Sequence, residues 1–395
     1  MHRLSVIAVA GLAACALAVY FLGVWTPYTE ARTIARGAAD FKELSDRFAA
    51  LAERKGAEYA FEVLRRTQFP PQTDLHLLGH VVGDELYKQK GIEGIAVCTQ
   101  DFRNACSHSI VIGALDEYGG EEALGLVRDA CEKAPGGPGA YTMCYHGLGH
   151  GVFAFFGYDL TPTVAFCEKT GTERYHEQEY TECVGGAIME LMGGGGHDRE
   201  AWLTARVKYL SEDNPLLPCM SGEVPDQAKA LCLVYLTPRL LELAGANLGN
   251  PDQALFPKAL AFCDAIPASE QELRDACFGG FGKEFVPLAG KRDIRRVDEF
   301  TDQEYKTAIG WCLLAESDDG RRACIADAVA SVFWGGENDP EASFRFCKLA
   351  EGVSRDACYK RLAEDIGRYA QEDIRSDLCS RIPADSRGAC VSSGS

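Results

Sequence analysis

The sequence predicts an all-α protein. We expect one N-terminal transmembrane helix followed by a solenoid of αα-hairpin repeats, each held together by a disulfide. Two observations predict this architecture. An uncharged run of 22 residues extends from Leu4 to Trp25. After it, cysteines recur at alternating short and long gaps, with similar residues around many of them. We expect three parts: residues 1–28 as a membrane anchor or signal segment, 29–200 as histidine-bearing helical repeats, and 201–395 as further disulfide-stapled helical repeats.

The N-terminal segment is long enough to cross a bilayer as a helix. Its 22 uncharged residues match the ~30 Å hydrocarbon core, whereas a cleavable signal usually has ~7–15 apolar residues. Two alternatives stay open: cleavage at the Ala-Leu-Ala of residues 16–18, and lipidation of Cys15. Arg3 and the amino terminus favour an N-terminus inside the cell. Every alternative places residues 30–395 outside the cytoplasm, in a periplasmic or extracellular compartment, with the membrane as a partner of the anchored form.

The charge of the chain excludes one class of partner. The formal net charge is −18, and nucleic-acid phosphates need an excess of lysine and arginine. We therefore expect no nucleic-acid partner. The same charge argues against electrostatic binding to anionic lipid. A solvated acidic surface explains the excess of carboxylates.

The cysteines predict a disulfide in each repeat. An even number of them follows Cys15, no CxxC spacing occurs, and an exported chain folds in an oxidising compartment. Pairing each cysteine with its neighbour across the short gap is the one scheme that treats all repeats alike. Each such bridge contributes about 3 kcal/mol in the chain-entropy model. The expected bridges are Cys98–Cys106, Cys131–Cys144, Cys167–Cys183, Cys219–Cys232, Cys263–Cys277, Cys312–Cys324, Cys347–Cys358 and Cys379–Cys390.

A recurring tetrapeptide identifies the repeat unit as a helix hairpin. The second cysteine of a pair often closes an R-x-A-C sequence, as at residues 274–277, 321–324 and 355–358. In the segment 251–285, an amphipathic pattern ends near Cys263, a loop with Pro267 follows, and a second helical pattern runs through Cys277. A lone hairpin cannot bury its apolar face, so we expect neighbouring hairpins to stack.

Five of the eight histidines occupy equivalent places in this repeat: His76, His80, His108, His146 and His150. Each lies two or six residues after the closing cysteine of its unit, or after Asp74 in an N-terminal unit without a disulfide. Residues i and i+4 share one helix face, and equivalent positions of successive units lie side by side. We therefore expect the imidazoles to converge from three adjacent helices. Glycines beside them, such as Gly149, indicate close packing.

Converging imidazoles suit a transition metal best, because neutral imidazole is the commonest side-chain ligand of Zn, Cu, Fe and Ni. Asp84 continues the histidine face and is a sixth candidate, either as a ligand or as a partner that fixes a histidine tautomer. Weaker carboxylate candidates are Glu85, Asp116, Asp159 and Glu190. Binding should weaken below about pH 6, since the ligands must be neutral. Haem, metal-free acid–base chemistry, and histidines that only pack or respond to pH stay open.

Two functions follow from this interpretation. The first is an exported, membrane-anchored metalloprotein with a histidine-rich Zn, Cu or Fe site, with a metal-dependent hydrolase or oxidoreductase as the candidate activities. The second is an extracytoplasmic scaffold without catalysis, which binds a protein, a glycan or a small molecule in the groove of the solenoid. No histidine follows His197, and this segregation favours the first, because a generic scaffold has no reason to collect histidines at one end.

Overall fold

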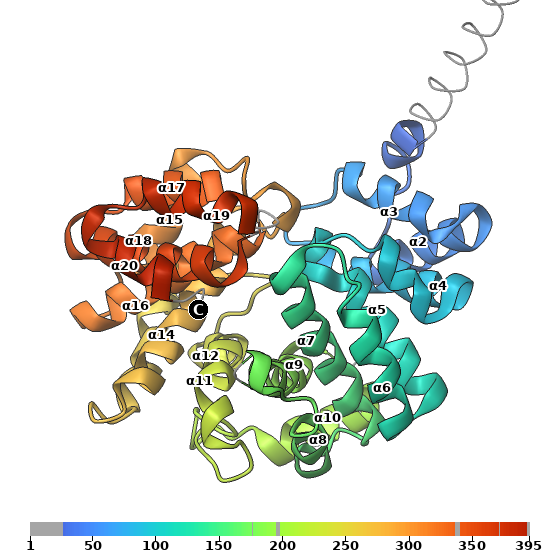
Figure 1. The fold of residues 1–395 in the computed structure, drawn as a ribbon, viewed down its shortest axis with the longest axis horizontal. Coiled ribbons are helices and arrows are strands. Elements are labelled where there is room, and N and C mark those ends of the chain that lie inside the picture. The colour runs from blue at the N-terminus through green and yellow to red at the C-terminus, as the bar shows by residue number, and fades with distance from the viewer. Residues whose placement is uncertain (1–26, 176, 195–197, 336–339, 371, 393–395) are drawn as a thin grey trace, which may run out of the picture.

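The computed structural model describes residues 27–175, 177–194, 198–335, 340–370 and 372–392. Within these ranges the regular structure is helical, apart from one isolated bridge between Asn247 and Asn250. The all-α class and the helical repeats are confirmed. Figure 1 shows the helices following one another along a curved path from blue through green and yellow to red.

One set of helices forms the stack at the centre of the fold. We call them the B helices; each packs against the next along the chain. They are α4 (Leu75–Lys90), α5 (Asp101–Tyr118), α7 (Gly137–Phe155), α9 (Gln178–Gly193), α11 (Asp226–Tyr235), α14 (Gln271–Ala289), α16 (Asp318–Gly335), α18 (Gly352–Tyr369) and α20 (Ala384–Ser392).

The remaining elements lie before or between the B helices, and most of them form the first arm of a hairpin. They are α2 (Phe41–Lys55), α3 (Ala57–Arg66), η1 (Gly91–Val97), α6 (Gly120–Cys131), α8 (Leu160–Cys167), η2 (Glu173–Tyr175), α10 (Arg199–Tyr209), α12 (Thr237–Ala244), η3 (Gln253–Leu255), α13 (Phe256–Leu260), η4 (Ala261–Ala265), η5 (Ile294–Arg296), α15 (Asp302–Cys312), α17 (Pro340–Leu349) and α19 (Glu372–Arg381).

Local sequence signals set several of these boundaries. Asp74 begins α4 because its carboxylate accepts a hydrogen bond from the backbone N–H of Leu77. At α15, Thr301 and Glu304 form a reciprocal capping box. The hairpin formed by α13 and α14 differs in one detail from the expected one. Its first arm, which carries Cys263, is the short α-helix α13 continued by the 3₁₀ turn η4. The hairpin itself is retained.

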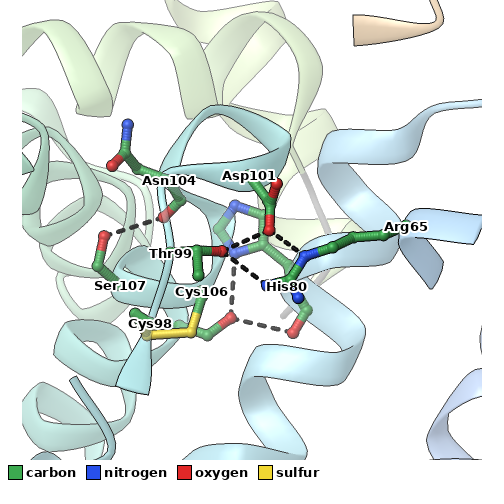
Figure 2. The surroundings of a disulfide bond; sticks show 9 residues. Arg65, His80, Cys98, Thr99, Asp101, Asn104, Cys106 and Ser107 are labelled. Carbon is green, nitrogen blue, oxygen red and sulfur yellow. Dashed lines mark hydrogen bonds and ion pairs between the residues drawn. A yellow bond between two sulfur atoms is a disulfide. The ribbon is translucent and has the colours of Figure 1, made fainter. Parts of the chain in front are cut away.

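The disulfides join the two arms of each hairpin. All eight bridges connect short-gap neighbours, and their Cα–Cα distances lie between 5.4 and 5.8 Å, within the usual range. The pairing expected from the spacing is therefore the pairing found. Figure 2 shows the first bridge, Cys98–Cys106, which connects the end of η1 to α5. This bridge fixes the start of the helix that carries His108.

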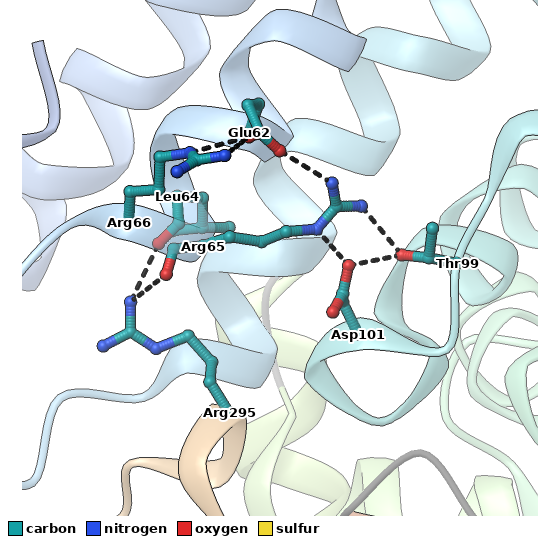
Figure 3. A network of polar contacts seen from close by, with 7 residues as sticks. All are labelled: Glu62, Leu64, Arg65, Arg66, Thr99, Asp101 and Arg295. Atoms are coloured by element: carbon teal, nitrogen blue, oxygen red, sulfur yellow. Dashed lines mark hydrogen bonds and ion pairs between the residues drawn. The ribbon is translucent and has the colours of Figure 1, made fainter. Parts of the chain in front are cut away.

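The stack does not remain open, because its later units return to its first ones. Helix α16 contacts α5, and α18 contacts α7. Figure 3 shows the guanidinium of Arg295 at the end of α3, where it donates to the carbonyl oxygens of Leu64 and Arg65 at 3.0 and 3.1 Å. The same nitrogen donates to the Thr67 carbonyl at 2.7 Å. An arginine is well suited to the unpaired carbonyls at a helix C-terminus.

Two apolar clusters form the core. One extends from Ala31 to Val152 and includes Phe166 and Ile294, and the other extends from Phe153 to Cys390. The division of the repeats at residue 200 stays a prediction. The expected anchor of residues 1–28 falls almost wholly on residues 1–26, outside the described residues. Among the residues that are described, no helix combines the length and apolar character that a membrane span requires.

Candidate metal centre

Three adjacent B helices bring the five predicted histidines together. His76 and His80 come from α4, His108 from α5, and His146 and His150 from α7. Every ring lies near at least two others of the group, with ring-centroid distances of 4.7 Å (His76–His80), 5.4 Å (His76–His108), 5.5 Å (His80–His108), 6.1 Å (His80–His150), 5.6 Å (His108–His146), 5.7 Å (His108–His150) and 5.1 Å (His146–His150). The expected convergence is thus the observed one.

Close helix packing makes this cluster possible. A Cβ on Gly147 would lie 2.5 Å from the Cδ2 atom of His108, so the glycine leaves room for that imidazole. A Cβ on Gly149 would lie 1.9 Å from the carbonyl oxygen of Cys183, so this glycine lets α7 and α9 approach. The glycines beside the histidines therefore serve helix contacts and the seating of one ring.

The tautomers of His76 and His80 depend on their partners. The Nδ1 atom of His76 lies 2.6 Å from the carbonyl oxygen of Phe102, which can only accept, so this nitrogen carries the proton. The hydroxyl of Ser109 lies 3.0 Å from the His80 carbonyl and 3.2 Å from His80 Nδ1. When it donates to the carbonyl, its oxygen accepts from Nδ1; when it donates to Nδ1, the proton of His80 lies on Nε2. Figure 2 shows His80 beside the Cys98–Cys106 bridge.

The Nε2 atoms of His76 and His80 lie 3.2 Å apart. Because His76 Nδ1 carries a proton, the Nε2 atom of neutral His76 bears no hydrogen, so it can accept from His80 Nε2–H or ligate a cation. Burial lowers the pKa of His76 to about 4, which keeps this nitrogen unprotonated at neutral pH. Two nitrogens that share a tetrahedral Zn²⁺ at about 2.0–2.1 Å are about 3.3 Å apart, close to the observed separation.

His108 and His150 present further unpaired nitrogens. His108 is 1% exposed, and neither of its ring nitrogens has a hydrogen-bond partner. His150 places Nδ1 at 3.0 Å from a carboxylate oxygen of Glu190, while its Nε2 is buried without a partner. A carboxylate on one imidazole nitrogen is the usual arrangement around a metal-bound histidine. One ring nitrogen each of His76, His108 and His150 lies within 4.8 Å of the other two.

His146 stands at the edge of this group and faces a softer atom. Its Nε2 lies 3.4 Å from the Met189 sulfur, and its Nδ1 lies 3.3 Å from a Glu182 carboxylate oxygen. Burial raises the pKa of Glu182 to about 7, while burial and the neighbouring His150 hold the pKa of His146 well below its usual value. Near neutral pH a proton in this pair therefore lies on Glu182 rather than on His146.

The side chain of Asp84 is exposed on α4. Its expected role, as a ligand or as a partner of a histidine, stays a prediction. At 3.6 residues per turn, a position eight residues after His76 is rotated by about 80° from it, which turns Asp84 outward. Glu190 and Glu182 on α9 are the carboxylates that reach the imidazoles. His2, His176 and His197 lie outside the described residues.

An unusual backbone segment supports His76. Phe102, Arg103 and Asn104 have φ angles of 57°, 56° and 63° in the left-handed region. Three consecutive non-glycine residues there cost about 1–2 kcal/mol each. The turn directs the Phe102 carbonyl to His76 and places Arg103 against α16, where it donates to Ser331 at 3.0 Å. Strain that persists in this way is typical of functional sites.

The sequence contained a signal for Met189, which sequence reasoning did not use as a site residue. Met189 lies six residues after Cys183, the same place that His150 takes after Cys144. Lys283 has this place after Cys277, and its environment is described below. Glu190 follows Met189 directly. No protein-family model, no curated protein and no solved structure matches the chain at a significant level.

Proposed function

We propose that this protein is an exported, membrane-anchored metalloprotein that holds a transition metal on His76, His80, His108 and His150. The single observation that carries the proposal is the convergence of ring nitrogens: one nitrogen each of His76, His108 and His150 lies within 4.8 Å of the other two. Both ring nitrogens of His108 and the Nε2 atom of His150 are buried without a hydrogen-bond partner. Neutral imidazoles bind through their lone pairs, and one divalent ion can accept several of them.

The candidate ligands fit the general design of a helical metal site. They project from neighbouring helices, and their second nitrogens are fixed by a carbonyl, a hydroxyl and a carboxylate. His76 and His80 are partly exposed, so an ion can enter from solvent. When bound, Zn would activate water for hydrolysis, and Cu or Fe would support electron transfer. His146 and Glu182 are placed to move a proton beside the site.

One atom bears on the identity of the metal. The thioether of Met189 lies 3.4 Å from His146 Nε2. Imidazole suits Zn, Cu and Fe alike, whereas a thioether is a soft ligand that favours Cu(I). Copper is therefore the first candidate for an ion that is also bound by His146, at the edge of the four ligands. For such an ion, a Met189→Leu variant should lower the affinity for Cu(I) while leaving Zn binding unchanged.

The proposed compartment rests on the disulfides. Eight bridges in one chain are typical of an oxidising, extracytoplasmic environment. We propose that the N-terminal segment tethers the protein to the membrane. The alternative function, a protein- or glycan-binding scaffold without catalysis, would leave the buried, unpaired ring nitrogens of His108 and His150 without an explanation.

Elemental analysis of the full-length protein, purified without chelator, tests the proposal. We expect at least one equivalent of Cu, Zn or Fe. His108→Ala should reduce the metal content while the disulfide-stapled fold is retained by circular dichroism. His197→Ala is the matched control and should keep the metal. Protein that is metal-free, and that takes up none of these ions or Ni, would contradict the proposal and favour the scaffold.

A further inference from the structure

A second group of charged side chains lies next to the histidines and comes mainly from the histidine-free half of the chain. It consists of Arg103 on α5, Lys283 and Glu284 on α14, Arg292 after α14, and Asp74 at the start of α4. We call it the cationic cluster. The guanidinium of Arg292 pairs with Asp74 at 2.7 Å, and Lys283 pairs with Glu284.

One aromatic ring connects this cluster to the candidate metal centre. The ring centroid of Tyr235, on α11, lies 4.9 Å from that of His146. The ammonium of Lys283 lies 4.8 Å from the same tyrosine centroid. Asp74 provides a second connection between the cationic cluster and the histidines. It directly precedes α4 and lies two residues before His76. The cationic cluster therefore adjoins the imidazoles at two places.

The cluster contains more positive than negative charge. Arg103, Lys283 and Arg292 face the two carboxylates of Glu284 and Asp74, so one positive charge is in excess before any metal is added. The Nε atom of Arg103 is buried without a hydrogen-bond partner. Burial lowers the pKa of Lys283, and the nearby Arg103 and Arg292 lower it further, although Glu284 opposes them. An excess of buried positive charge is costly unless an anion accompanies it.

Solvent reaches these groups in part. The side chains of Arg292 and Lys283 are 22% and 18% exposed, and that of Asp74 is 35% exposed. An anion in solvent can therefore reach part of Lys283 and Arg292.

We propose that Arg103, Lys283 and Arg292 bind the anionic oxygens of a small substrate, a carboxylate or a phosphate, at a subsite beside the metal. Arginine and lysine are the usual partners of these groups. The orientation toward a metal rests on the proposed function, whereas binding of the anion does not. The subsite exists only because the later units return to the first ones, which gives the histidine-free half a part in the site.

Calorimetric titration of the full-length protein with inorganic phosphate, and separately with acetate, tests the subsite. We expect binding of at least one of the two anions, and the tighter one identifies the class. Lys283→Met should weaken it by about tenfold to a hundredfold, the range for one charge-assisted hydrogen bond. Lys283→Arg should restore most of it. Lys306→Met, an exposed position on α15, is the matched control and should bind as the unmodified protein does.

The outcomes separate this inference from the proposed function. Metal content is measured on every variant, and it should be unchanged in Lys283→Met. Arg292→Gln provides a second test, on a more exposed side chain, if Lys283→Met does not fold. Protein that binds neither anion, or variants at Lys283 and Arg292 that bind as tightly as the unmodified protein, would overturn the subsite. Anion binding that depends on Lys283, in protein that takes up none of Cu, Zn, Fe or Ni, would support the subsite and contradict the proposed metal.

Discussion

Replacing Glu190 by glutamine should weaken metal binding without removing a ligand. The Glu190 carboxylate lies 3.0 Å from Nδ1 of His150, a normal hydrogen-bond distance. Glutamine keeps the shape and an acceptor oxygen but loses the charge that makes the imidazole a better donor to the metal. Partners of this kind contribute about 10–100-fold in metal affinity, which corresponds to about 1.4–2.7 kcal/mol. The backbone carbonyl of Glu190, which accepts from Trp202 at 2.9 Å, is unaffected.

The assay is competition with a chromophoric chelator, using Zn²⁺ and the full-length protein. Glu53→Gln, an exposed position on α2, is the matched control and should leave the affinity unchanged. Thermal melting of the metal-free variants shows whether the fold is retained. An unchanged Zn²⁺ affinity of Glu190→Gln, with a retained fold, would refute the role of this carboxylate and the selection of His150 as a ligand.

Three further predictions concern packing, covalent staples and pH. Gly149→Ala should destabilise the fold by about 1–3 kcal/mol, because the Cβ would clash with the Cys183 carbonyl. Gly125→Ala on α6, where the Cβ meets nothing within 4 Å, should be neutral or stabilising; equal melting temperatures of the two would contradict the clash. Replacing the Cys131–Cys144 bridge by two serines should cost about 3 kcal/mol by denaturant unfolding, and an unchanged midpoint would argue against the staple. Because burial lowers the pKa of His76 to about 4, its Nε2 stays unprotonated in mild acid, so dialysed protein should keep metal at pH 5 and lose it as the pH falls toward 4; loss already near pH 6.5 would be inconsistent with that burial.

The repeat made much of the site predictable from the sequence. Histidines two and six residues after a closing cysteine had to share a helix face, and equal places in neighbouring units had to meet. Only local geometry and the stacking of adjacent hairpins were needed for His76, His108 and His150. The disulfides followed from the same regularity. The expected threshold near pH 6 used the ordinary pKa of imidazole, whereas the burial that lowers the pKa of His76 to about 4 depends on tertiary packing.

The contacts between distant units were not predictable in the same way. Arg295 reaches the end of α3, and Arg292 reaches Asp74, across more than 200 residues of sequence separation. No repeat pattern encodes such contacts, since they depend on the curvature that accumulates over all the units. The left-handed turn at Phe102 was also hidden, because none of its residues is a glycine. Asp84 is exposed because the helix phase drifts over two turns from His76.

The local environment of the bound metal tests the central claim most directly. X-ray absorption spectroscopy of the copper- or zinc-loaded protein should show three to four imidazole nitrogens at about 2.0–2.1 Å. In His80→Ala this number should fall by one, because His80 Nε2 is one of the two facing nitrogens. A first shell made mainly of carboxylate or water oxygens, or a nitrogen number that does not respond to His80→Ala, would contradict the account.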